Sequence, residues 1–172
     1  MIFTEGMIQS MTLSKQNSQI MKEYLRNDHI AMMKQFTHHR KISTYQHSVN
    51  VLKKSCNMAN FFKFSDEQIK NIIIGAILHD FYLYDYHHAR KRKNGIHAWS
   101  HPVTALHNAE KYFVLNDKQR NIIRSHMYPT CLLHPPKCKE AWVVTLADKY
   151  CAIEEYVVTL FSKHALHRYA TI

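Results

Sequence analysis

The sequence predicts an all-α protein, and three observations support this fold class. Apolar residues recur every three or four positions through long stretches, rather than alternating as they do in a half-buried strand. Only 3 Gly and 4 Pro occur among 172 residues, which leaves few residues suited to tight hairpin turns. Polar tetrads typical of helix starts precede apolar stretches at residues 43–46, 65–68 and 116–119.

The length predicts a single domain over residues 1–172, because a chain of this size can bury a substantial core without disulfides. We expect the core that carries the motifs to span about residues 43–156. The ends, at residues 1–13 and 164–172, are expected to be loosely ordered. The sequence contains no internal repeat, and it leaves the oligomeric state open.

Cysteine use and hydropathy predict a cytoplasmic protein. The four cysteines form no C-x-x-C pair, and the N-terminus lacks a basic-then-apolar secretory signal. No apolar run approaches the roughly 18 residues of a membrane span, so no membrane partner is expected. The formal net charge of +10 favours anionic partners, namely phosphorylated metabolites, nucleotides or nucleic acid.

Taken in order, residues 14–36 predict two short scaffold helices with a break near Asn27 and Asp28. The basic residues 37–42 are expected to form a solvated connection. The tetrad Ser-Thr-Tyr-Gln at residues 43–46 has the form of a capping box, and the helix that it begins carries His47 in its first turns.

A second capping box, at residues 65–68, begins a helix whose apolar face leads directly to His79 and Asp80. An imidazole and a carboxylate side by side are costly to bury unless each has a partner. A divalent cation can be the partner of both. The end of this helix is therefore a candidate metal site.

Three more candidates follow along the chain. Ser100 is expected to cap a helix with Pro102 in its first turn, which places His101 at the helix start. The third cap, at residues 116–119, begins a helix that leads to His126. A final long helix is expected over about residues 138–162. It places Asp148 in an apolar stretch, where an unpaired carboxylate would be unfavourable.

The order of these candidates, a His, a His-Asp doublet, two further His and a distal Asp, resembles the HD superfamily of metal-dependent phosphohydrolases. The resemblance covers roughly residues 43–156 and implies an HD-type helical bundle. The fragments that carry it are Tyr45-Gln46-His47-Ser48, Gly75-Ala76-Ile77-Leu78-His79-Asp80, His101-Pro102, Ile123-Arg124-Ser125-His126 and Leu146-Ala147-Asp148-Lys149.

The resemblance implies a metal site of one or two ions. In the family's pattern, Asp80 is a ligand of the first ion and bridges to a second. The other first-ion ligands are His47, His79 and Asp148, and the second-ion ligands are His101 and His126. Nitrogen and oxygen ligands suit Fe, Mn, Co, Ni or Zn. His97 is a rival to His101, which we prefer for its place at a helix start.

The implied function is hydrolysis of a nucleotide or another small phosphoester by a metal-activated water. Two alternatives remain open. The first is a non-hydrolytic module that holds metal and binds a nucleotide or nucleic acid. The second is oxygen chemistry at a di-iron site, which relatives with additional His ligands carry out. Nucleic acid is less favoured as a partner than a small phosphorylated substrate.

The segment after the doublet departs from the commonest form of the family, which has a phosphate-contacting lysine there. Residues 81–87 instead resemble a bacterial subgroup with an aromatic Leu-Tyr-Asp-aromatic-His segment. Asp85 and His87 are therefore candidates for proton donation or substrate orientation. The cations that could replace the missing lysine are Arg90, Arg92 and Lys149.

Overall fold

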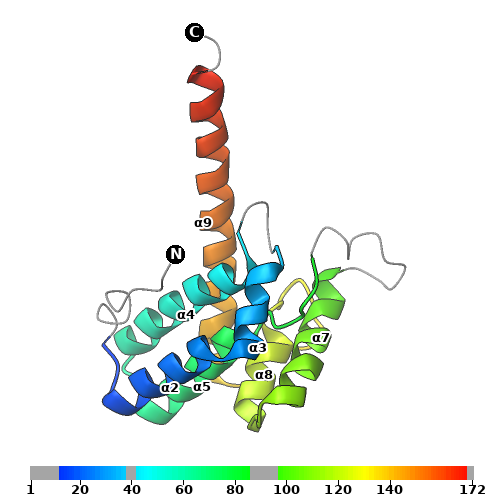
Figure 1. Ribbon diagram of the computed structural model, residues 1–172. Helices are drawn as coiled ribbons and strands as arrows, with labels where there is room; N and C mark the ends of the chain where they lie inside the picture. The colour runs from blue at the N-terminus through cyan, green and yellow to red at the C-terminus, as the bar shows by residue number, and fades with distance from the viewer. Residues whose placement is uncertain (1–11, 38–41, 86–96, 170–172) are drawn as a thin grey trace.

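The computed structural model describes residues 12–37, 42–85 and 97–169, and it confirms the all-α fold class (Figure 1). In these ranges the β-type pairing is an isolated bridge between Thr37 and Ser43. None of the helices described is both long and apolar enough to cross a membrane. The elements are α2 (Lys15–Arg26), α3 (Asp28–Ala31), the 3-10 helix η1 (Met32–Gln35), α4 (Thr44–Phe61), α5 (Asp66–Leu78), α7 (His97–Tyr112), α8 (Asp117–Ser125) and α9 (Lys139–Tyr169).

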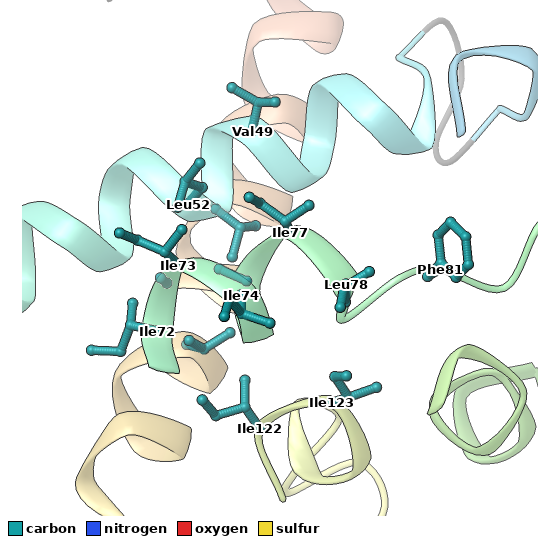
Figure 2. Packing of buried hydrophobic residues seen from close by; sticks show 14 of the residues in the cluster. Val49, Leu52, Ile72, Ile73, Ile74, Ile77, Leu78, Phe81, Ile122 and Ile123 are labelled. Atoms are coloured by element: carbon teal, nitrogen blue, oxygen red, sulfur yellow. The ribbon is translucent and has the colours of Figure 1, made fainter. Parts of the chain in front are cut away.

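Helix α5 lies at the centre of the bundle, as its nearly continuous apolar sequence requires. Helices α2, α4, α8 and α9 pack around it. In Figure 2, Leu52 of α4 lies beside Ile73 of α5, and Ile122 of α8 lies on the other side. Each fully buried aliphatic side chain contributes about 1.5–3 kcal/mol. Because α5 is enclosed on several sides, His79 and Asp80 at its end are also buried.

Two of the three predicted capping boxes are confirmed, at the starts of α5 and α8. There the side chains of Ser65 and Asn116 each accept a backbone hydrogen bond, and a glutamine side chain reaches back to the cap. The box at the start of α4 is incomplete. Ser43 accepts from the backbone of Gln46, but the side-chain amide of Gln46 donates to Oδ1 of Asn50 at 3.0 Å instead.

The predicted break between the first two helices is confirmed. Asn27 ends α2, and its side chain accepts from the backbone N–H of His29 at 2.9 Å to begin α3. The side chain of Asn17 on α2 donates to the backbone carbonyl of Asp66 at 3.0 Å. These bonds attach the N-terminal helices to the start of α5.

Two predicted helix boundaries are wrong. Helix α7 already includes His97, so His101 lies in its second turn and Pro102 lies inside the helix. Because proline has no backbone N–H, Pro102 cannot donate a hydrogen bond to the preceding turn of α7. Helix α9 runs to Tyr169 instead of ending near residue 162, and residues 163–169 contain no Gly or Pro to stop it.

Gly75 permits the close approach of α5 to α8, and its replacement by alanine should destabilise the protein. A Cβ at this position would lie 2.5 Å from Cγ2 and 2.8 Å from Cβ of Ile122, which is fully buried. We expect Gly75→Ala to lower the free energy of unfolding by about 1–3 kcal/mol despite alanine's higher helix propensity. Urea denaturation measures this. A Gly75→Ala variant as stable as wild type would show that the two helices separate without cost.

Candidate metal centre

Five segments of the chain converge on one buried cluster of imidazoles and carboxylates. The ends of α5 and α8 contribute side chains from the positions just after the helix, whereas α4, α7 and α9 contribute them from within the helix. Each of these side chains belongs to a residue that is at most 6 % exposed. The structure thus brings together the six residues that the sequence analysis preferred as ligands: His47, His79, Asp80, His101, His126 and Asp148.

His79 and His126 are oriented by the same local device. Each is the C-cap residue of its helix, and each bonds through Nδ1 to a backbone carbonyl three residues earlier, at 2.8 Å in both cases. A carbonyl can only accept, so Nδ1 of each ring carries the proton. When the ring is neutral, its lone pair is therefore on Nε2, which faces the centre of the cluster. Burial lowers the pKa of His126 to about 4, so this ring is neutral at pH 7.

His47 has carboxylates on both sides of its ring. Nδ1 lies 3.0 Å from Oε2 of Glu155, and Nε2 lies 3.0 Å from Oδ1 of Asp148. Although burial opposes the charged form, the hydrogen bonds to these two carboxylates raise the pKa of His47 to about 10. In the protein without metal, this histidine is an imidazolium.

Asp80 lies between two pairs of histidines, and its two oxygens face different pairs. Oδ2 lies 3.5 Å from Nε2 of His79 and 3.9 Å from Nε2 of His47. Oδ1 lies 3.4 Å from Nε2 of both His101 and His126. The Nε2 atoms of His101 and His126 are 2.8 Å apart. One carboxylate therefore addresses two neighbouring groups of nitrogen donors, as a bridging ligand would.

Asp148 completes the group around His47 and His79. Its Oδ1 lies 3.0 Å from Nε2 of His47 and 3.7 Å from Nε2 of His79, while Oδ2 accepts from Nζ of Lys149 at 2.8 Å. Burial opposes ionisation here, but the hydrogen bond with His47, the nearby ring of His79 and the charge of Lys149 hold the pKa of Asp148 well below its usual range. Asp148 is therefore ionised at neutral pH.

The donor set fits one or two divalent cations. Two triads have ligand atoms within 4.8 Å of one another, one formed by His47, His79 and Asp148 and the other by His79, Asp80 and His126. Nε2 of His79 is buried and has no hydrogen-bond partner among the residues described. A buried, unpartnered acceptor is costly unless something binds it. Imidazole and carboxylate donors without thiolate suit the transition metals from Mn to Zn.

The remaining predicted site residues fall into two groups. Nζ of Lys149 lies beside the cluster and also donates to the backbone carbonyl of His126 at 2.9 Å. Oδ1 of Asp85 accepts from the backbone N–H and the hydroxyl of Thr37, both at 2.9 Å. These two bonds hold Asp85 against Thr37, and its role in proton donation stays a prediction. Outside the described residues or side chains lie His87, Arg90, Arg92 and His97.

Sequence reasoning missed Glu155, the carboxylate behind His47. Its residue is 8 % exposed, and Oε1 accepts from Nδ2 of Asn50 at 2.8 Å. The available signal was spacing, because Glu155 follows Asp148 by two helical turns and so lies on the same face of α9. Because its neighbour Glu154 is exposed, the Glu154-Glu155 pair resembles part of the solvated face of a helix.

The environment of His47 predicts a pH-dependent stability of the metal-free protein. A pKa raised from 6.5 to about 10 means that this stabilisation is complete below pH 6.5 and is lost as the pH rises towards 10. In the presence of a chelator, we expect the free energy of unfolding to fall between pH 7 and 9. The fall should be smaller in His47→Gln. Equal slopes in the two proteins, measured by urea denaturation, would contradict this assignment.

Comparison with known proteins gives one match. A family model described as the HD domain matches residues 44–153, which is more than half of the chain. The matched range includes all six clustered histidines and aspartates, and it ends just before Glu155. No curated protein matches, and no solved structure matches.

Proposed function

The chain belongs to the HD domain family, and from this premise we propose that it hydrolyses a nucleotide or another small phosphoester at the histidine and aspartate cluster. HD domains are in general metal-dependent phosphohydrolases that bind divalent metals. The observation that carries the proposal is the division of the Asp80 carboxylate between two pairs of buried histidines. A carboxylate in this position suits a site for two ions.

The proposed roles follow from the donor atoms. His47, His79, Asp80 and Asp148 would hold a first ion, and His101, His126 and the other oxygen of Asp80 a second. When bound, such ions lower the pKa of a water and offset the charge of phosphoryl oxygens. The chain itself supplies fixed geometry: backbone carbonyls orient His79 and His126, and Lys149 orients Asp148.

We propose that cations near the cluster recognise the substrate phosphate in place of the missing lysine. Lys149 is the candidate that the structure describes, since its ammonium lies 2.8 Å from the Asp148 carboxylate and is partly exposed. Arg90, Arg92 and His87 remain proposed contributors from the segment after the doublet. The net charge of +10 also favours an anionic substrate.

The test is metal analysis of protein purified without added metal, followed by a panel of phosphoesters and nucleotides assayed with Mn, Co, Ni and Fe. We expect bound transition metal and hydrolysis of at least one nucleotide or small phosphoester. Tight nucleotide binding without turnover would support a metal-containing binding module instead. Absence of both turnover and binding across the panel would defeat the proposal.

A further inference from the structure

Glu155 connects two helices immediately behind the candidate metal centre. It lies on α9 and bonds through Oε2 to Nδ1 of His47 on α4, at 3.0 Å. Its other oxygen accepts from Asn50 at 2.8 Å. His47 itself is fully buried. Through the bond to Nδ1, Glu155 contacts the cluster by way of His47.

The donor and acceptor of each hydrogen bond that links Gln46, Asn50 and Glu155 can be assigned. Nε2 of Gln46 donates to Oδ1 of Asn50 at 3.0 Å, which leaves the Asn50 amide nitrogen to face Glu155. The reverse orientation of Asn50 would set a carbonyl oxygen against a carboxylate, and two acceptors repel. Glu155 therefore receives a hydrogen bond at each oxygen. The proton of His47 belongs on Nδ1, and Nε2 is the atom available to a metal.

His47 needs a carboxylate partner because it cannot bond to a backbone carbonyl of its own helix as His79 and His126 do. His79 and His126 end their helices and bond backbone carbonyls of those helices. His47 lies near the start of α4, where the carbonyls of the preceding turn accept the helix's own backbone bonds. The acceptor has to come from another element, and α9 provides it two turns beyond Asp148.

We propose that Glu155 is a positioning residue of the metal centre, which fixes the tautomer and the ring orientation of His47 with the help of Asn50 and Gln46. This inference rests on the proposed metal-dependent function. Carboxylate partners of ligand histidines typically change metal affinity by about 10–100-fold when removed. Glu155→Ala should therefore weaken metal binding by about that factor without removing any ligand.

The surroundings of Glu155 allow chemical rescue. Glu155 and Asn50 line a groove of about 470 Å³ between α4 and α9, together with Lys53 and Lys54. In Glu155→Ala, a small carboxylate such as formate can enter from this groove and occupy the vacated position beside Nδ1 of His47. The neighbouring lysines favour its entry by charge.

The test compares metal affinities by calorimetric titration of the chelator-treated protein with Mn. Glu155→Ala should bind about 10–100-fold more weakly than wild type, and formate in place of chloride at equal ionic strength should recover part of the loss. Glu155→Gln keeps the size of the side chain but places its amide nitrogen against one of the two donors, Nδ1 of His47 or Nδ2 of Asn50. This variant should therefore also bind metal more weakly than wild type. Glu154→Ala, on the same groove, is the matched control and should bind like wild type.

The outcomes separate this inference from the function on which it rests. Wild-type protein that binds no metal at the cluster would defeat both. Wild-type binding with an unchanged affinity in Glu155→Ala would overturn the inference alone, as would an equal loss in Glu154→Ala. A loss in Glu155→Ala that formate does not recover, together with wild-type affinity in Glu155→Gln, would assign Glu155 to packing. Wild-type protein titrated in both salts reports any effect of formate on the metal itself.

Discussion

Asp80→Ala is expected to abolish phosphoester hydrolysis while leaving the helices intact. The carboxylate faces all four histidines of the cluster, so its loss removes a ligand from both groups of nitrogen donors at once. Metal contributes several kcal/mol to such reactions, and each 1.4 kcal/mol is a factor of ten in rate. We therefore expect a fall in kcat of at least about 10³-fold.

Helix content in Asp80→Ala should stay close to wild type by circular dichroism, because α5 is held by its own buried apolar face. Asp117→Ala is the matched control, since this carboxylate is fully exposed at the start of α8 and should leave activity unchanged. Full hydrolysis by the metal-loaded Asp80→Ala protein would place the active site elsewhere.

The double variant His101→Ala, His126→Ala is expected to keep about one ion per chain and to lose most of its activity. Both histidines lie 3.4 Å from Oδ1 of Asp80, whereas the ligand atoms of His47, His79 and Asp148 form a triad of their own. A two-ion site places the ions about 3.5–4 Å apart and uses both on the reacting phosphate. Loss of the second ion should therefore lower the rate of hydrolysis much more than it lowers the free energy of unfolding.

Elemental analysis and calorimetric titration measure the metal count of the double variant directly. His107→Ala is a suitable control, because His107 lies on the same helix, less than two turns after His101, but is exposed. A wild-type protein that saturates at one ion, with the double variant equally active, would show that the second ion does not exist.

Much of the fold was accessible from the sequence because it depends on local signals. Ser65 and Asn116 cap their helices through bonds to residues three positions away, and the apolar face of α5 is visible as spacing alone. The start of α7 was misplaced because Ser100 and Pro102 match the residue preferences of a helix start, whereas the structure places both inside the helix. Local patterns of this kind locate helices better than they locate helix ends.

The candidate ligands were found by residue type and order, but their convergence depends on how five segments pack. The spacing from Asp148 separates Glu155 from Glu154, but the contact of Glu155 with His47 depends on the packing of α9 on α4. The incomplete cap at Ser43 has a similar origin. Gln46 donates to Asn50 because that amide belongs to a chain of bonds that ends at His47. Side-chain networks between distant segments could not be predicted from local sequence patterns.

Anomalous scattering from a crystal of the Mn-loaded protein tests the central claim most directly, because it locates bound metal without reference to activity. The account predicts a peak within metal-ligand bonding distance of Nε2 of His47 and His79 and of carboxylate oxygens of Asp80 and Asp148. A second peak is predicted beside His101 and His126. Metal-saturated crystals with peaks only at surface histidines, and none within the cluster, would contradict it.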